Sequence, residues 1–347
     1  LMKTRWIDVW WKIFLLPCVQ AFMARSSLNS NLHDIHYHEI MKKRVFPLLL
    51  SSTDDGGGLY RPFLEHAWDK LKQSGMFLSE NEGKSKEQLE KYSKTFLVPP
   101  ELATNIANAK GMPPGTQVRI SIDAAYGKDP ITYVRYALLE TIPPPPRDGD
   151  VYTKGIQVLN FVVFTKPPFP VWGVDLVSLP GGRHLLTIDA QPMMSGQSSL
   201  TLNSSPDDPW QDWYETHVQN TFPWGGDLPE DVQKFFSPHA LWTRLIKDKD
   251  HNNDDDDDDG IHRIRTHAFD AFCAHLDLFL KTIIAGEGND DELNDDNSFE
   301  TSHHLEEYLD YRLANDPARP MLKSLYGADW TERVLHEILF NKERILL

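Results

Sequence analysis

An aspartate in the middle of an apolar segment is the first residue of this sequence that could carry chemistry. Asp175 lies in the run 171–179, whose apolar and β-branched residues predict a strand. A carboxylate is costly to bury as an anion, so Asp175 must either find a hydrogen-bond donor or take up a proton, and a protonated carboxyl group can act as a general acid. Gly173, on the same face, would leave room for a flat ligand. The alternative is a structural role, in which Asp175 caps a turn or pairs with an arginine.

Asn160 and Asp316 could act together with this carboxyl group. Asn160 interrupts the apolar face of the segment 156–164, where its amide could donate to a ligand carbonyl without titrating or satisfy a hydrogen bond of the core. Asp316 comes directly before Pro317, the order typical of a helix start, with Asp as the N-cap and Pro as the first helical residue. Capping and catalysis do not exclude each other at such a position.

Other polar residues give weaker signals. Asp189 and Gln191 share one face of the segment 184–191, which is equally consistent with an edge that faces water. The pairs His303/His304 and His262/His267 have no acid or cysteine at metal-ligand spacing, so we expect structural or surface roles for them. The sequence contains no Gly-rich phosphate loop and no CxxC pair, so neither a nucleotide cofactor nor an iron–sulfur cluster is predicted.

The segments that carry these residues alternate in hydrophobicity as strands do. Alternation predicts strands within 118–122, 134–138, 156–164, 171–179 and 184–191. The short turns that join the last three of them predict an antiparallel meander. Helical spacing is found at 60–71 and, after Trp210, at 261–284, 303–315 and 329–340. Strands followed mostly by helices predict an α+β domain built in layers.

Composition narrows the function further. The formal net charge is −16, and phosphate binding needs a basic face, so we expect no nucleic-acid partner. A mean hydropathy of −0.44 leaves no room for a membrane-spanning body, and we expect no membrane association. Two cysteines, Cys18 and Cys273, support neither a disulfide framework nor a thiolate metal site.

Several segments together resemble the ferredoxin-dependent bilin reductase family, over roughly residues 58–342. They are LNFVVF at 159–164, WGVDLV at 172–177 with LPGG at 179–182, IDAQP at 188–192, FFSPHALWTR at 235–244, and the C-terminal block from Tyr311 through 315–319 (NDPAR) and 330–333 (WTER) to Phe340. The resemblance implies a three-layer α/β/α sandwich with a central antiparallel sheet. It also implies that no metal or organic cofactor is bound, and that reduced ferredoxin delivers single electrons to an open-chain tetrapyrrole to which the protein supplies protons.

Site residues follow from the same resemblance. Asp175 matches the family's central strand aspartate and is expected to be the principal proton donor; Asp316 matches the C-terminal aspartate, a second donor or bilin-positioning group. Asn160 stands where the relative that makes phycocyanobilin has a histidine, which argues against that product. Glu140 is near an acid of the same relative, but its register is uncertain because of the insertion at 143–150.

The resemblance also predicts the reaction and the partners. PWGGD at 223–227 is similar to the branch that reduces 15,16-dihydrobiliverdin at the A-ring diene to (3Z)-phycoerythrobilin. The alternatives are a reductase of the same family that converts biliverdin to 15,16-dihydrobiliverdin, and a bilin carrier without activity. Expected partners are ferredoxin, the tetrapyrrole and the upstream bilin reductase. Propionates and acidic ferredoxins need cations, and the candidates are Arg319, which we assign to substrate binding, Lys323, Arg333, Lys342 and Arg344.

The N-terminal segment and two acidic runs depart from this domain, which is expected to occupy 47–347. Residues 1–46 begin with basic residues and a short apolar stretch, and continue after Phe22 with a Ser-rich stretch that carries Arg. This order resembles the two-part leader of algae with secondary plastids and predicts a location in the plastid stroma; the alternative is an amphipathic helix. The acidic runs at 248–259 and 287–296 are expected to be disordered loops that project away from the ferredoxin-binding face.

Overall fold

The computed structural model describes nine stretches of the chain: 58–76, 93–97, 115–142, 155–179, 182–193, 208–228, 230–246, 260–286 and 295–346. The predicted leader at 1–46, the insertion at 143–150 and the acidic run at 248–259 lie outside the described residues. The second acidic run is described only at its end. There Asp295 and Asp296 begin a helix, so the prediction of a loop over the whole of 287–296 was wrong at these two positions.

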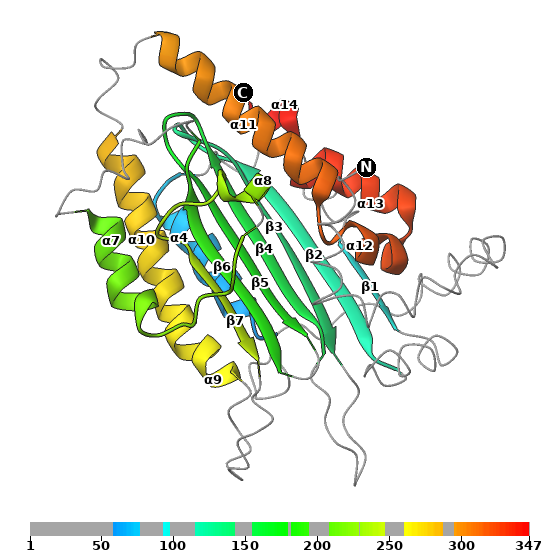
Figure 1. Cartoon of the computed structure of the whole chain (residues 1–347). Coiled ribbons are helices and arrows are strands. Elements are labelled where there is room, and N and C mark those ends of the chain that lie inside the picture. Colours follow the sequence, from blue (N-terminus) through cyan, green and yellow to red (C-terminus); the bar gives the residue numbers. More distant parts are fainter. Residues whose placement is uncertain are drawn as a thin grey trace.

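One seven-stranded antiparallel sheet organises the described part of the chain (Figure 1). Its strands are β1 (Lys94–Leu97), β2 (Gln117–Tyr126), β3 (Ile131–Ile142), β4 (Gln157–Thr165), β5 (Val171–Leu179), β6 (Arg183–Gln191) and β7 (Leu241–Ile246). Spatial order follows sequence order, because each strand pairs with the next one along the chain. The predicted meander is therefore confirmed. β1 was not predicted, and β7 lies in the half that was predicted to be helical.

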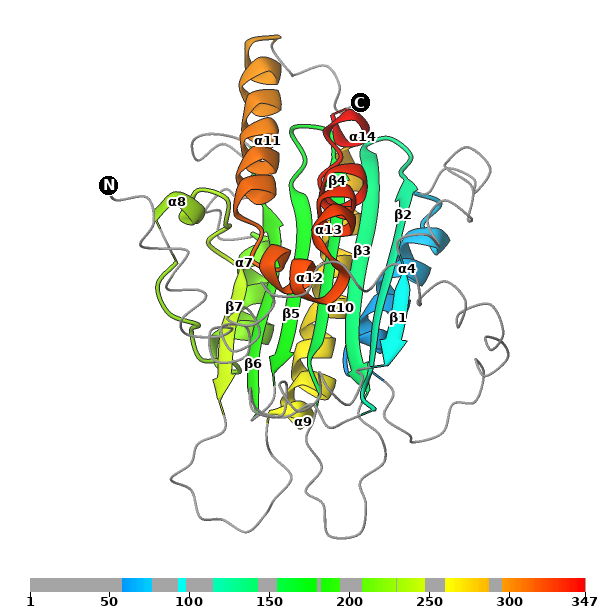
Figure 2. The same cartoon turned by 90° about the vertical axis from the view of Figure 1, so that its right-hand side faces the viewer.

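Helices cover both faces of the sheet, as Figures 1 and 2 show. One face carries α4 (Arg61–Gln73), α7 (Pro209–Tyr214) and α10 (Phe269–Gly286). The other carries α11 (Asp295–Asn315), α12 (Arg319–Tyr326), α13 (Ala328–Val334) and α14 (Lys342–Ile345). The three-layer sandwich predicted from the sequence is confirmed. Short elements complete the described stretches: α8 (Glu230–Gln233), α9 (Ile261–Arg263), and three π-helical turns, η3 (Glu215–Gln219), η4 (Ile264–Ala268) and η6 (Leu335–Leu339).

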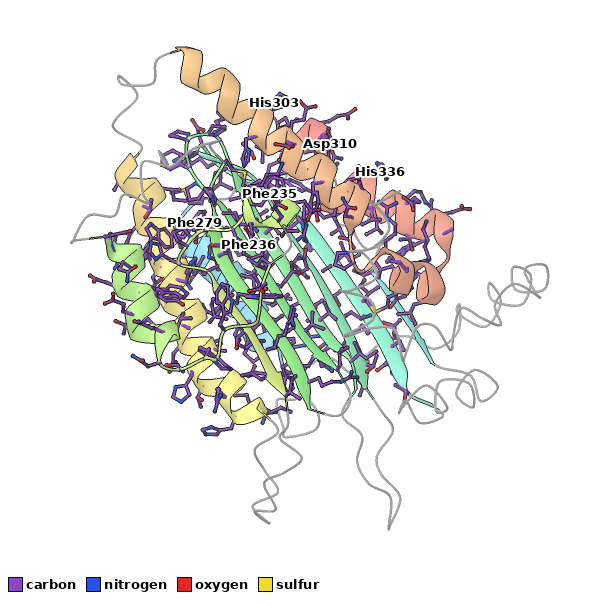
Figure 3. All side chains as sticks on the ribbon, in the orientation of Figure 1. Phe235, Phe236, Phe279, His303, Asp310 and His336 are labelled. Carbon is purple, nitrogen blue, oxygen red and sulfur yellow. The ribbon has the colours of Figure 1, made fainter. Side chains whose placement is uncertain are left out.

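The α10 side of the sheet carries a large cluster of buried apolar residues. Phe279 of α10, labelled in Figure 3, stacks on Trp172 of β5 with ring centroids 6.1 Å apart. Trp172 also donates from its indole nitrogen to Nδ1 of His275 at 2.8 Å. Burial lowers the pKa of His275 to about 3, so this histidine is neutral and serves the core.

The α11 side of the sheet carries a second apolar cluster, which polar residues interrupt. Phe235, labelled in Figure 3, packs against Tyr308 and Tyr311 of α11 with ring centroids 5.3 Å and 5.5 Å away. On β3, Tyr133 donates its hydroxyl to the carbonyl of Ile338 at 3.1 Å, which ties the sheet to η6. The polar residues of this face surround the cavity that follows.

Candidate active site

A cavity lies between the α11 side of the sheet and the C-terminal helices. Its volume is about 1080 Å³ when the open space at its mouth is included. Strands β2 to β6 form one wall, and the segment from α11 to η6 forms the other. The lining is apolar apart from four residues, Asn160, Asp175, Arg312 and Asp316. Such a site suits a large, mostly apolar ligand that needs a few polar contacts.

Asp175 and Asn160 are directly paired neighbours on β5 and β4, and both line this cavity. The amide nitrogen of Asn160 donates to Oδ1 of Asp175. Oδ2 of Asp175 faces Nη2 of Arg312 at 3.4 Å, and the aspartate side chain remains 35% exposed. Asp175 has thus found donors on both oxygens, including the arginine of the structural alternative, and it also borders a ligand-sized space.

Two arginines hold this pair, and neither was singled out in the sequence. Arg312 reaches it from α11, and Arg135 from β3 donates through Nη1 to the amide oxygen of Asn160. Arg135 is fully buried and donates from Nε to the carbonyl of Leu339 at 3.1 Å. Burial and the nearby Arg312 lower the pKa of Arg135 to about 10, which leaves it charged at neutral pH. The four residues form a polar chain across three strands and a helix.

Asp316 enters the cavity from the opposite wall, between α11 and α12. Its Oδ1 accepts from the backbone nitrogens of Ala318 at 2.8 Å and Arg319 at 3.1 Å. Burial raises the pKa of Asp316, and Arg312 and the Ala318 N–H oppose this rise. The helix begins at Arg319, so the prediction that Pro317 is its first residue was wrong. Asp316 nevertheless satisfies two N–H groups ahead of that helix and lines the cavity.

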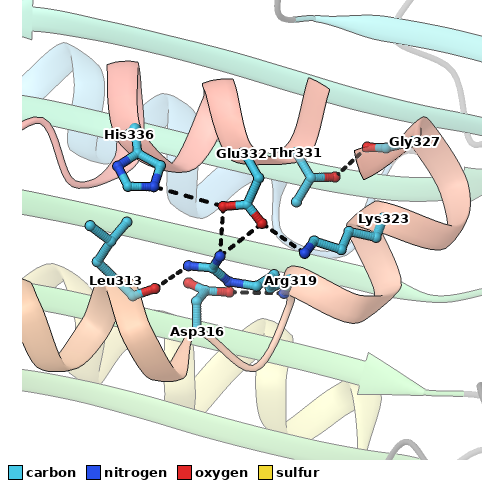
Figure 4. A network of polar contacts seen from close by, with 8 residues as sticks. All are labelled: Leu313, Asp316, Arg319, Lys323, Gly327, Thr331, Glu332 and His336. Atoms are coloured by element: carbon cyan, nitrogen blue, oxygen red, sulfur yellow. Dashed lines mark hydrogen bonds and ion pairs between the residues drawn. The ribbon is translucent and has the colours of Figure 1, made fainter. Parts of the chain in front are cut away.

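Arg319, predicted to bind substrate, is engaged elsewhere (Figure 4). Its Nη1 donates to Glu332 Oε1 at 2.8 Å and Oε2 at 2.6 Å, and its Nη2 donates to the carbonyl of Leu313. The same Glu332 carboxylate lies 2.8 Å from Nζ of Lys323 and 3.7 Å from Nε2 of His336. Arg319 does not line the cavity, and its role in substrate binding stays a prediction.

The other predicted cations also lie outside the cavity lining. Nζ of Lys342 is 2.6 Å from Asp310 and 3.3 Å from Glu306, both on α11. The guanidinium of Arg344 lies over the Tyr126 ring, 5.4 Å from its centroid. Within the described residues, Arg312 is the cation that borders the cavity.

The strand face that carries Asp189 and Gln191 does not face water, so the alternative of a water-facing edge was wrong. Asp189 is fully buried and accepts from the backbone nitrogen of Ser237 at 3.0 Å and from its hydroxyl at 2.5 Å. Burial raises the pKa of Asp189 to about 7, although both Ser237 bonds oppose this rise. Gln191 fills the space at Gly173, where an added Cβ would lie 3.2 Å from its Oε1, so the expected room for a ligand there is already occupied.

Glu140 points to the other face of the sheet, away from the cavity. The directly paired residue, Arg119, donates to it from Nη2 at 2.7 Å, and Arg61 of α4 donates to it at 2.5 Å. Its carboxylate is buried in this ion-paired cluster. Among the described residues we found no cluster of His, Cys, Asp and Glu that could hold a metal ion, and none of the described helices is long and apolar enough to span a membrane.

The chain is similar in sequence to proteins of one family. A family model described as ferredoxin-dependent bilin reductase matches residues 151–341. A protein of Nostoc punctiforme named phycoerythrobilin:ferredoxin oxidoreductase is 37% identical over 193 residues, covering 55% of this chain and 68% of that protein. A protein of the same name from Prochlorococcus marinus subsp. pastoris is 36% identical over 198 residues, again covering 55% and 68%.

A solved structure supports the fold. The crystal structure of phytochromobilin synthase from tomato, in complex with biliverdin, superposes with a TM-score of 0.57 and 22% sequence identity. The superposition covers 83% of this chain and 85% of that one. At this identity the likeness concerns the arrangement of the layers.

Proposed function

Because the chain belongs to the ferredoxin-dependent bilin reductase family, we propose that it reduces 15,16-dihydrobiliverdin at the A-ring diene to (3Z)-phycoerythrobilin. The protein is an oxidoreductase of the kind that takes electrons from ferredoxin. The reaction adds two electrons and two protons to the bilin. Reduced ferredoxin supplies the electrons one at a time, and the protein supplies a proton after each of them.

One observation carries the proposal: Asp175 from the sheet and Asp316 from the C-terminal layer line the same cavity. After the first electron, the bilin is a radical anion, which becomes neutral when Asp175 transfers a proton to it. The second electron and a proton from Asp316 complete the reduction. Burial favours the protonated form of Asp316, which suits a donor at neutral pH.

The choice of substrate rests on two lines of support. The relatives named phycoerythrobilin:ferredoxin oxidoreductase are 33–37% identical to this chain. In addition, Asn160 places an amide beside Asp175, and an amide can orient a bilin carbonyl but cannot donate an acid proton to it. An amide at this position, in place of a histidine, argues against phycocyanobilin as the product.

The proposal extends to the setting of the reaction. A plastid stroma supplies reduced ferredoxin, and the order of basic, apolar and Ser-rich residues in 1–46 supports that location. The substrate then comes from the reductase that acts on biliverdin first, which makes this upstream enzyme a partner in substrate transfer.

Anaerobic turnover tests the proposed reaction. The purified protein is mixed with reduced ferredoxin and either 15,16-dihydrobiliverdin or biliverdin, absorbance is followed, and products are separated by chromatography; omission of ferredoxin is the control. We expect loss of 15,16-dihydrobiliverdin and formation of phycoerythrobilin, with biliverdin unchanged. Reduction of biliverdin alone would assign the chain to the preceding step, and binding of both bilins without reduction would make it a carrier.

A further inference from the structure

Arg135 is the end of the polar chain that reaches Asp175 through Asn160. The three side chains come from consecutive strands, and each lies on the α11 side of the sheet. Arg135 Nη1 donates to the Asn160 amide oxygen, and the Asn160 amide nitrogen donates to Asp175 Oδ1. Arg135 does not line the cavity, so any effect on the bilin must pass through its neighbours.

The chemistry of a guanidinium group fixes the direction of these hydrogen bonds. Arginine has five N–H donors and no acceptor, so the Asn160 atom that faces Arg135 must be the amide oxygen. The amide nitrogen must then face Asp175. A rotated amide would place two donors against each other at the fully buried Arg135 and two acceptors against each other at Asp175.

Arg135 cannot leave this position easily. Its Nε donates to the carbonyl of Leu339 at 3.1 Å, and its guanidinium lies over the Phe340 ring, 5.2 Å from the centroid. It is fully buried. The orientation of the Asn160 amide is therefore set by a side chain that is itself held on two sides.

Both oxygens of Asp175 face a donor, but the donor at Oδ1 is close and the donor at Oδ2 is distant. Oδ1 accepts the Asn160 N–H, so a proton on Oδ1 would meet a second donor. Oδ2 faces Arg312 across 3.4 Å, a long and weak contact that leaves room for a proton directed into the cavity.

We propose that Arg135 is a positioning residue that fixes the Asn160 amide, and thereby places the transferable proton of Asp175 on Oδ2. The inference rests on the proposed function, because it concerns the proton that Asp175 gives to the bilin. In this step the O–H bond at Oδ2 breaks, a bond from that proton to the singly reduced bilin forms, and Asp175 is left as a carboxylate. The electron has come from reduced ferredoxin.

The test is a double-mutant cycle between Arg135 and Asn160, with kcat and KM measured on the bilin that the wild-type protein reduces. Arg135→Met removes the donors, and Asn160→Leu removes the amide. We expect Arg135→Met to lower kcat by about 10- to 100-fold with KM within about threefold. In the Asn160→Leu background the same substitution should change kcat by less than about twofold, because the amide is no longer there to be oriented.

Two further variants separate positioning from structure. Tyr133→Phe is the matched control, since Tyr133 lies on the same strand and also bonds to η6, through Ile338, but does not contact Asn160; its kcat should stay near the wild-type value. Arg135→Lys keeps a group that only donates, and it should retain kcat within about fivefold. If Arg135→Met does not fold, the kcat of Arg135→Lys tests the positioning role instead.

The outcomes against the proposal are specific. Equal losses of kcat from Arg135→Met in both backgrounds would mean that Arg135 does not act through the amide. A loss in Tyr133→Phe as large as in Arg135→Met, or a loss in folded Arg135→Lys as large as in Asn160→Leu, would reduce Arg135 to a structural anchor. If the wild-type protein reduces biliverdin, the cycle is run on biliverdin, so the positioning role is tested even when the substrate assignment fails.

Discussion

The substitution Asp316→Asn separates the two roles that the structure gives to Asp316. The carboxyl oxygen Oδ1 accepts from the Ala318 and Arg319 backbone nitrogens, and an asparagine oxygen can accept the same two bonds. The amide has no acid proton. We therefore expect the helix start to survive and the proton transfer to fail, with kcat lower by about 10²- to 10⁴-fold, the usual contribution of a positioned acid.

The variant Asp316→Ala measures how much the two accepted hydrogen bonds contribute to the free energy of unfolding. Alanine loses both accepted bonds, and loss of a capping side chain costs about 1 kcal/mol of the free energy of unfolding. In a domain of this size that corresponds to a melting temperature lower by roughly 2–4 °C. Asp316→Asn should show no such drop, because burial of the carboxyl group disfavours its charged form at neutral pH and the neutral amide avoids that cost.

The assay combines thermal unfolding with anaerobic turnover under single-turnover conditions, and electron paramagnetic resonance follows the bilin radical. A stable Asp316→Asn protein that accumulates a radical would support the assignment. Turnover within about twofold of the wild-type rate would refute it and leave Asp316 as a capping or bilin-positioning residue only.

Three other substitutions have defined expected effects on kcat or on stability. Asp175→Asn should still bind bilin, seen by absorbance titration, but should lose about 10²-fold or more in kcat; undiminished turnover would rule out its role as a donor. For Asp189, the pKa is about 7 in the folded protein and 3.8 in the unfolded chain, so stability falls as pH rises from about 4 to 7, by on the order of 4 kcal/mol. Asp189→Asn should flatten this slope in urea unfolding at several pH values, whereas the exposed control Asp212→Asn should not; an unchanged slope would contradict the assignment. Glu140→Gln should destabilise the fold by about 1–3 kcal/mol in urea unfolding while kcat is unchanged, and a large loss of kcat would place Glu140 in the reaction.

Most of the sheet could be predicted because strands β2 to β6 are long and most of them are joined by short turns. Strands β2 to β6 each show a clear period of two or a continuous apolar run, and glycine and proline mark the connections. The strand β7 was missed because its six residues, LWTRLI, stand alone between helical segments, and a short apolar run fits either structure. β1 has only four residues, KTFL, which is too short for a period to show.

The sequence predicted those site residues that interrupt a local pattern, and it missed residues whose burial depends on the tertiary fold. Asp175, Asn160 and Asp316 are anomalies in their local patterns, and the structure brings all three to one cavity. Arg135 and Asp189 also lie on strands, but strand alternation separates two faces and does not tell which face water reaches. In a sheet covered on both sides, a polar residue on either face can be fully buried, as both of these are. Their role depends on partners such as Ser237 and Leu339 that are distant in sequence.

The meander has a consequence for how the protein is made. Each strand pairs with the strand before it, so the sheet can assemble step by step while the nascent chain leaves the ribosome. The second wall of the cavity is synthesised last, since Asp175 and Arg312 are 137 residues apart. A newly made chain therefore holds an open half-site, with the sheet's apolar face uncovered, until its final helices dock. Ribosome-bound chains that end before α11 should bind chaperones more strongly than chains released after α14.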